Sequence, residues 1–128
     1  MRLVLVRHAE AAPGNPDELR QLTPAGREQA RRLGDELRAQ GIEPDAVVAS
    51  PLLRALETAN GLGLGSVVVD ERLAPGATPE DIRAVAAEHG DTVVLVGHQP
   101  DCGRAVAALG GGSEPAFPPG AHAMVELT

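Results

Sequence analysis

Two histidines and two arginines follow short apolar runs at three separate places in the sequence. They are Arg7 and His8 after residues 3–6, Arg54 shortly after residues 46–49, and His98 after residues 93–96. Guanidinium groups bind phosphate oxygens through paired hydrogen bonds, and an imidazole can attack phosphorus or hold one of its oxygens. The chemistry that this set of side chains favours is therefore the binding and transfer of a phosphoryl group.

The two histidines take different roles in this interpretation. We assign the attack on phosphorus to His8, because it directly follows a strand whose neighbouring backbone can fix the tautomer of its ring. An imidazole attacks only when it is neutral, which an ordinary pKa of about 6.5 permits at neutral pH. His98 instead lies just before a predicted helix, where it is suited to binding a phosphoryl oxygen. Together with Arg7 and Arg54, it would clamp the equatorial oxygens of the transferred group.

Short apolar runs rich in Val and Leu predict the strands that must position these side chains. Each run is nearly continuous rather than alternating, which is typical of strands buried on both faces. The runs cover residues 3–6, 46–49, 67–69 and 93–96. Residues 121–127 supply a fifth strand, which we expect at an edge of the sheet.

Helical stretches separate the strands. Their predicted starts are Thr23-Pro24, Ser50-Pro51, Thr78-Pro79 and Pro100, and their predicted ends are Gly41, Gly61, Gly90 and Gly110.

Alternating strands and helices predict an α/β fold with a mainly parallel sheet, helices on both faces and right-handed crossovers. The carboxyl ends of such strands meet at one edge. That edge would hold both histidines and both arginines, together with two helix N-termini that favour anions.

Length and loop composition favour one domain. The chain has 128 residues, which is within the usual size of a single domain. Residues 9–22 and 110–120 contain clusters of Gly and Pro and are predicted to be surface loops. Neither segment is long enough to link two separate cores. We therefore expect a single domain over residues 1–128.

The composition excludes several functions. The sequence contains no Lys, no Trp, no Tyr and one Phe, and all 11 of its positive side chains are Arg. Without Lys there is no Gly-Lys-Ser/Thr phosphate loop and no Schiff-base lysine. The near absence of aromatic residues disfavours stacking on single-stranded nucleic acid. The 18 acidic residues leave a net charge of −7, so we expect neither nucleic acid nor a membrane as a partner.

Cysteine and metal-ligand patterns predict a cytoplasmic protein without a bound metal. Cys102 is the single cysteine, so an internal disulfide is impossible and a reducing cytoplasm is the expected location. Residues 1–6 are too few for a signal peptide or a membrane span. A metal site built from His8, Glu10 and His98 lacks the usual His-x-His or His-Glu-x-x-His spacing. We therefore expect no metal and no cofactor.

Four segments of the sequence resemble the histidine phosphatase superfamily. They are LVRHAE at residues 5–10, LTPAG at 22–26, SPLLRALETA at 50–59 and VGHQP at 96–100. The Arg-His pair alone is a weak match, but its combination with the Ser-Pro-x-x-Arg-Ala-x-x-Thr and Gly-His segments is specific. The short length and the segment LAPG at 73–76 look most like the small bacterial phosphohistidine phosphatases of the SixA type.

This resemblance implies a phosphoglycerate mutase-like fold, a phosphohistidine intermediate on His8 and no metal. It also implies a substrate contact for Arg20, which matches a further arginine often present at that place. The substrate would be a protein that carries phosphohistidine. Two alternatives are a small-molecule phosphomonoesterase of the same fold and a non-catalytic module that only binds phosphate.

The source of the proton for the leaving group is open. Many larger relatives carry a Glu or Asp for this purpose in an insertion that this chain is too short to hold. Glu71, which follows the predicted strand at 67–69, is the nearest candidate, and Glu10 and Asp101 are alternatives. Because imidazole leaves more readily than an alkoxide, a phosphohistidine substrate would lessen the need for a strong acid. The missing insertion would also leave the site open, as a protein substrate requires.

Overall fold

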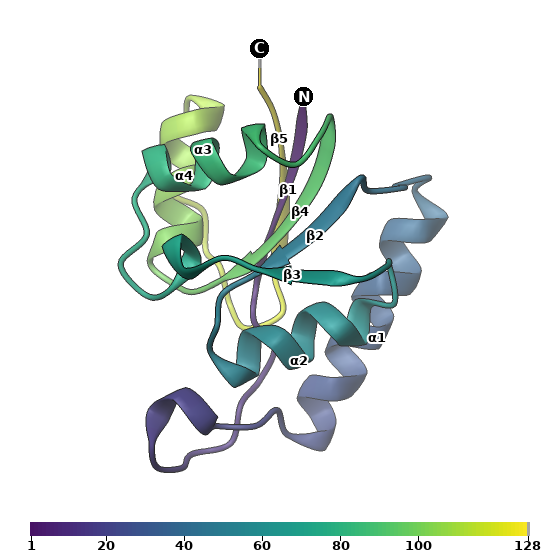
Figure 1. Ribbon diagram of the computed structural model, residues 1–128, viewed down its shortest axis with the longest axis vertical. Helices are drawn as coiled ribbons and strands as arrows, with labels where there is room; N and C mark the ends of the chain where they lie inside the picture. The colour runs from purple at the N-terminus through teal and green to yellow at the C-terminus, as the bar shows by residue number, and fades with distance from the viewer. Residues whose placement is uncertain (128) are drawn as a thin grey trace.

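A five-stranded sheet runs through the centre of the computed structural model, which describes residues 1–127 (Figure 1). Its strands are β1 (Arg2–Arg7), β2 (Ala46–Ala49), β3 (Val67–Val69), β4 (Thr92–Gly97) and β5 (His122–Glu126). They lie in the order β3-β2-β4-β1-β5, and the pairs among β1 to β4 are parallel. β5 pairs with β1 in the antiparallel direction and forms one edge. The predicted strands and the mainly parallel sheet are confirmed.

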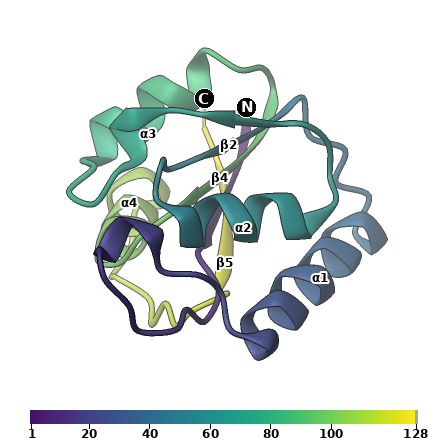
Figure 2. The ribbon, with the colours of Figure 1, turned by 60° about the horizontal axis from the view of Figure 1, so that its bottom comes forward.

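Four helices cover the two faces of this sheet. They are α1 (Pro24–Ala39), α2 (Leu53–Leu62), α3 (Pro79–Ala87) and α4 (Asp101–Gly110). α1 and α2 lie on one face, and α3 and α4 lie on the other (Figure 1 and Figure 2). Alternate residues of a strand point to opposite faces. In β1, Val4 and Val6 join the core under α1 and α2, whereas Leu3 and Leu5 join the core under α3 and α4.

Side-chain caps begin two of the helices where the sequence predicts. The Thr23 hydroxyl accepts a hydrogen bond from the Gly26 N–H at 2.9 Å, and Pro24 suits the first position of α1. At the start of α3, the Thr78 hydroxyl accepts from the Asp81 N–H, and the Asp81 carboxylate accepts from the Thr78 N–H in return. Each helix therefore begins one residue after its capping threonine.

α2 begins at Leu53, which is later than the predicted start at Ser50-Pro51. The Ser50 hydroxyl accepts a hydrogen bond from the Leu52 N–H at 3.2 Å, and this contact makes a local turn before the helix. Leu52 itself keeps an extended conformation, with φ −70° and ψ 138°. As a consequence, Arg54 lies in the first turn of α2, next to the carboxyl end of β2.

The loop at residues 9–22 contains structure that the sequence did not predict. Residues Asp17–Leu19 form a short 3-10 helix, and Ala11 pairs with Leu22 in an antiparallel bridge. The Glu57 carboxylate of α2 accepts a hydrogen bond from the Leu22 N–H at 2.8 Å. The loop therefore lies against α2 rather than standing apart from the fold.

Candidate active site

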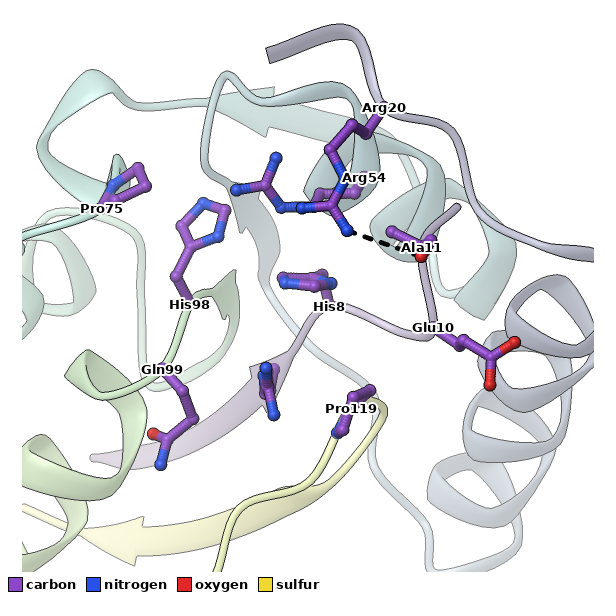
Figure 3. Close-up of a pocket in the computed structure, with 10 residues that line it drawn as sticks. His8, Glu10, Ala11, Arg20, Arg54, Pro75, His98, Gln99 and Pro119 are labelled. Carbon is purple, nitrogen blue, oxygen red and sulfur yellow. Dashed lines mark hydrogen bonds between the residues drawn. The ribbon is translucent and has the colours of Figure 1, made fainter. Parts of the chain in front are cut away.

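A pocket of about 310 Å³ opens where β1 and β4 end and α2 begins (Figure 3). β1 ends at Arg7, directly before His8, and β4 ends directly before His98. Arg54 comes from the first turn of α2. The residues that line the pocket are Arg7, His8, Glu10, Ala11, Arg20, Arg54, Pro75, His98, Gln99 and Pro119. The structure thus brings both predicted histidines and both predicted arginines to one edge of the sheet.

His8 is held in one tautomer by the backbone. It is 8% exposed, and its Nδ1 lies 2.8 Å from the carbonyl oxygen of Ala9. Because a carbonyl oxygen can only accept, Nδ1 carries the ring proton and Nε2 keeps its lone pair. Burial lowers the pKa of His8; the contact with Ala9 opposes this shift, and the charges of Arg54 and Arg7 add to it. His8 is therefore neutral near pH 7, with a nitrogen available for attack.

His98 lies opposite His8 and is buried more deeply. It is 3% exposed, and the centroids of the two rings are 5.4 Å apart. Its Nε2 lies 2.7 Å from the Ser50 hydroxyl oxygen, whereas its buried Nδ1 has no hydrogen-bond partner within residues 1–127. Burial, followed by the charges of His8 and Arg54, lowers the pKa of His98 to about 4. Figure 3 shows its ring pointing toward Arg54 and His8.

Arg7 and Arg54 each keep one buried donor without a partner. The Nη1 of Arg7 donates to the Phe117 carbonyl oxygen at 3.1 Å. Arg54 donates from Nη1 to the Asp17 carbonyl oxygen at 3.0 Å and from Nη2 to the Asp17 carboxylate at 3.2 Å. Among the described residues, the Nε of either arginine has no acceptor. A buried unpaired N–H is costly, so these donors favour an anion in the pocket.

Arg20 reaches the same pocket from the loop at residues 9–22. Its Nε donates to the Ala12 carbonyl oxygen at 2.9 Å, and its Nη1 contacts the Asp17 carboxylate at 3.2 Å. Asp17 therefore lies between Arg20 and Arg54, and both arginines lower the pKa of its carboxyl group. Sequence reasoning missed Asp17, because no local pattern shows that this loop residue contacts an arginine 37 positions away.

The three candidate acids lie in different places. Glu71 begins a short 3-10 helix after β3, is exposed and does not line the pocket, so the structure does not bring it to the two histidines. Asp101 is buried, and its carboxylate accepts two hydrogen bonds from the backbone N–H groups of residues 76–77. These bonds hold the loop before α3, so the carboxylate has a structural role. Glu10 does line the pocket, and its carboxylate accepts from the Thr23 hydroxyl at 2.8 Å.

Thr58, the last residue of the Ser-Pro-x-x-Arg-Ala-x-x-Thr segment, supports the site, although sequence reasoning gave it no role. Its hydroxyl donates to the Arg54 carbonyl oxygen at 2.7 Å and accepts from the Ala9 N–H at 2.9 Å. One buried side chain thus links the first turn of α2 to the end of β1. The available signal was its place in the segment at residues 50–59, which also contains Ser50 and Arg54.

Neither a metal cluster nor a membrane span occurs within residues 1–127. No three His, Cys, Asp or Glu side chains are grouped so that they could hold a metal ion. In the same part of the chain, no helix has the length and apolar character needed to cross a membrane. Three arginines and two histidines are among the residues that line the pocket, and their N–H groups suit an anionic ligand.

This fold, with two histidines and three arginines lining one pocket at the edge of its sheet, is that of a histidine phosphatase. Residues 3–74 match branch 1 of the histidine phosphatase superfamily. The match covers more than half of the chain and includes Arg7, His8, Arg20 and Arg54. The chain therefore belongs to this superfamily, as the sequence predicted.

One sequence comparison and one structure comparison extend the likeness over nearly the whole chain. The phosphohistidine phosphatase SixA of Escherichia coli K12 is 31% identical over 99% of this chain and 86% of its own length. A structure of the protein histidine phosphatase SixA complexed with tungstate superposes with a TM-score of 0.86 and 30% identity. That superposition covers 97% of this chain and 86% of the other. The homology supports a hydrolase of the phosphatase type and confirms the predicted fold.

Other relatives match a shorter segment. The mitochondrial serine/threonine-protein phosphatase Pgam5 of Drosophila persimilis is 46% identical over 59 residues, which is 45% of this chain and 20% of that protein. Pgam5 of Drosophila willistoni is 44% identical over 59 residues, which again is 45% of this chain and 20% of that protein. The matched segment is therefore a small part of these longer phosphatases.

Proposed function

We propose that this chain hydrolyses phosphohistidine in a protein, through a transient phosphohistidine on His8. The observation that carries the proposal is the state of His8. Burial lowers the pKa of its ring and so favours the neutral form near pH 7, its Nδ1 is bound to the Ala9 carbonyl oxygen, and its Nε2 is left as the nucleophile in a pocket with three arginines. Such a nitrogen can attack phosphorus without prior loss of a proton.

The reaction has two steps on this assignment. The lone pair of His8 Nε2 forms a bond to phosphorus while the bond from phosphorus to the leaving imidazole nitrogen breaks, and that nitrogen then takes up a proton. Water next attacks the phosphoryl group on His8 while the bond from phosphorus to Nε2 breaks. This step releases inorganic phosphate and one proton, which balances the proton taken up by the leaving imidazole, and it restores the neutral ring. Arg7, Arg54 and His98 hold the equatorial oxygens in both steps, and Arg20 contacts the substrate.

Three observations support phosphohistidine as the substrate. The relative that aligns over nearly the whole chain is named a phosphohistidine phosphatase. The SixA structure similar to this chain holds tungstate, which is a tetrahedral oxyanion like phosphate. Glu71 lies outside the pocket, and Asp101 and Glu10 are hydrogen-bonded to other groups of the chain, whereas a leaving imidazole needs a strong acid less than an alkoxide does. We propose no nucleic acid and no membrane as partners.

The proposal also includes a single domain over residues 1–128 and a cytoplasmic location. β1 and β5, from opposite ends of the chain, pair in one sheet, which supports the single domain. Cys102 is a buried free thiol, and a chain without a disulfide suits a reducing compartment.

The test is a phosphate-release assay on a panel of substrates with the wild type and His8→Ala. The panel contains a phosphohistidine protein, a phosphoserine peptide, sugar phosphates and nucleotides. We expect the highest kcat/KM for the phosphohistidine protein, and a loss of at least about 10³-fold in the His8→Ala variant. His89→Ala is the matched control, because His89 lies two residues after the end of α3 and does not line the pocket, so this variant should keep wild-type activity.

Rapid quenching separates an enzyme from a phosphate-binding module. Wild type mixed with substrate should yield an acid-labile phosphate on His8 that forms and decays on the timescale of turnover. Binding without an adduct or phosphate release would instead support the non-catalytic alternative. Faster turnover of a sugar phosphate or nucleotide would support the small-molecule phosphomonoesterase.

A further inference from the structure

Ser50 is buried beside the pocket and contacts one of its two histidines. Its side chain is inaccessible, and its hydroxyl oxygen lies 2.7 Å from His98 Nε2. The Ser50 N–H donates to the Val96 carbonyl oxygen at 3.0 Å, directly after the parallel pairing of β2 with β4. Both partners of the contact are therefore held by neighbouring strands of the sheet.

The hydroxyl proton of Ser50 has one available acceptor. A serine hydroxyl offers one hydrogen and two lone pairs, and the Leu52 N–H already donates to the Ser50 oxygen at 3.2 Å. Within residues 1–127, His98 Nε2 is the remaining hydrogen-bond partner of this oxygen. If Nε2 also carried a proton, the hydroxyl hydrogen would be buried without an acceptor, which is costly. Ser50 therefore donates to Nε2, and a neutral His98 carries its proton on Nδ1.

His98 Nδ1 is the atom that lacks a partner. It is buried, no described residue accepts its hydrogen bond, and the ring points into the pocket between Arg54 and His8 (Figure 3). His8 has the same protonated nitrogen, but Ala9 binds that N–H, so its Nε2 lone pair is left free. Two neutral imidazoles thus offer opposite groups: His8 offers a lone pair, and His98 offers an N–H.

We propose that Ser50 is a positioning residue that fixes His98 in its Nδ1–H tautomer, so that a neutral imidazole donates a hydrogen bond to the phosphoryl group. The proposal rests on the proposed function of the pocket, because it assigns the acceptor as a phosphoryl oxygen. In the other tautomer, a nitrogen lone pair would face an anionic oxygen and repel it. Ser50 would then affect the reaction without touching the substrate.

The first test reads the tautomer directly and needs no turnover. In 15N NMR spectra of the wild-type chain at neutral pH, we expect His98 with Nδ1 protonated and Nε2 unprotonated. In Ser50→Ala, the Nε2–H tautomer of His98 should increase, whereas Ser50→Thr should keep the wild-type pattern because it keeps the hydroxyl. A wild-type His98 with its proton on Nε2 would overturn the proposal, whatever the variants do.

The second test reads the consequence for the reaction. Ser50→Ala should lower kcat/KM by about 10-fold to 100-fold, less than the loss of a direct donor to the reacting group. Ser50→Thr should recover most of this loss. Ser66→Ala, which changes a serine at an exposed position before β3, should have the kcat/KM of the wild type. If Ser50→Ala loses activity while His98 in this variant keeps its wild-type tautomer, Ser50 acts by packing alone and the proposal fails. Absence of phosphatase activity in the wild type would refute the proposed function, while the spectra would still test the tautomer.

Discussion

At the scale of single residues, the groups that bind phosphate also prepare the nucleophile. Arg7 and Arg54 lie close enough to His8 to lower the pKa of its ring, in addition to the larger effect of burial. A protonated ring has no lone pair for phosphorus. The local positive charge that attracts the anion therefore also keeps His8 in its reactive form.

The first prediction of this arrangement concerns the titration of His8. In 15N NMR spectra recorded against pH, we expect the ring to titrate below pH 6.5, its ordinary value. Arg54→Gln should raise this midpoint relative to Arg54→Lys, because lysine keeps the positive charge beside the ring and glutamine does not. The acid limb of kcat/KM should follow the same order, since this ratio reports groups of the free enzyme. A wild-type midpoint above pH 6.5, or equal midpoints in the two variants, would contradict the argument.

Residues at the ends of strands could be predicted, and contacts between distant side chains could not. His8 and His98 each follow an apolar run that the sequence shows plainly, and parallel pairing brings such ends to one edge. The contact between Asp17 and Arg54 spans 37 positions and depends on the path of a loop. The hydrogen bond between Ser50 and His98 spans 48 positions and depends on where each side chain points. Neither property is encoded in local periodicity.

At the scale of elements, the close packing of α1 against its neighbours depends on two of its glycines. A Cβ atom on Gly34 would lie 1.9 Å from the Leu62 carbonyl oxygen of α2, and one on Gly26 would lie 2.1 Å from the Glu10 carbonyl oxygen. Both neighbours are backbone atoms, which cannot rotate away. α1 therefore approaches α2 and the segment after β1 more closely than any side chain would allow.

The second prediction is that Gly34→Ala destabilises the fold. In a helix, alanine is more stable than glycine by about 1 kcal/mol because of its higher helix propensity. The overlap with the Leu62 backbone, however, forces the two helices apart at a cost of about 3 kcal/mol. The clash outweighs the propensity, so the free energy of unfolding should fall by about 2 kcal/mol in urea titrations. Gly112→Ala is the control, because a Cβ at Gly112 meets no atom within 4 Å. Equal stabilities of the two variants would show that the helices can separate freely.

Sequence periodicity predicted which elements form but not their close packing. The cap at Thr23 and the capping box at Thr78 are local signals, and both helices begin where these signals stand. The start of α2 was predicted too early, because the turn at Ser50 uses its hydroxyl for the Leu52 N–H before the helix begins. A Ser-Pro pair is compatible with either outcome, and periodicity does not distinguish a capping serine from one that forms a turn before the helix.

At the scale of the whole molecule, acid acts on the fold through the same histidines that form the pocket. The pKa of His98 is about 4 in the folded chain and 6.5 as its ordinary value, so the unfolded chain binds more protons between these two pH values. The contribution of neutral His98 to the free energy of unfolding is therefore fully present above pH 6.5, and it is lost as the pH falls toward 4. The lowered pKa of His8 acts with the same sign. Asp45 and Asp70, whose pKa values are also lowered, add to the loss at lower pH.

The third prediction follows from this linkage. Urea titrations of the wild type should give a free energy of unfolding that falls by about 2 kcal/mol between pH 7 and pH 5 on account of His98, with a further decrease from His8. His98→Asn removes one of the two titrating groups, so its decrease over the same range should be smaller, whatever its stability at pH 7. His89→Asn changes a histidine that does not line the pocket, so this variant should keep the wild-type decrease. If His98→Asn loses as much stability as the wild type, His98 is not buried in its neutral form. The account of His98 as a neutral donor, which depends on that burial, would then fail as well.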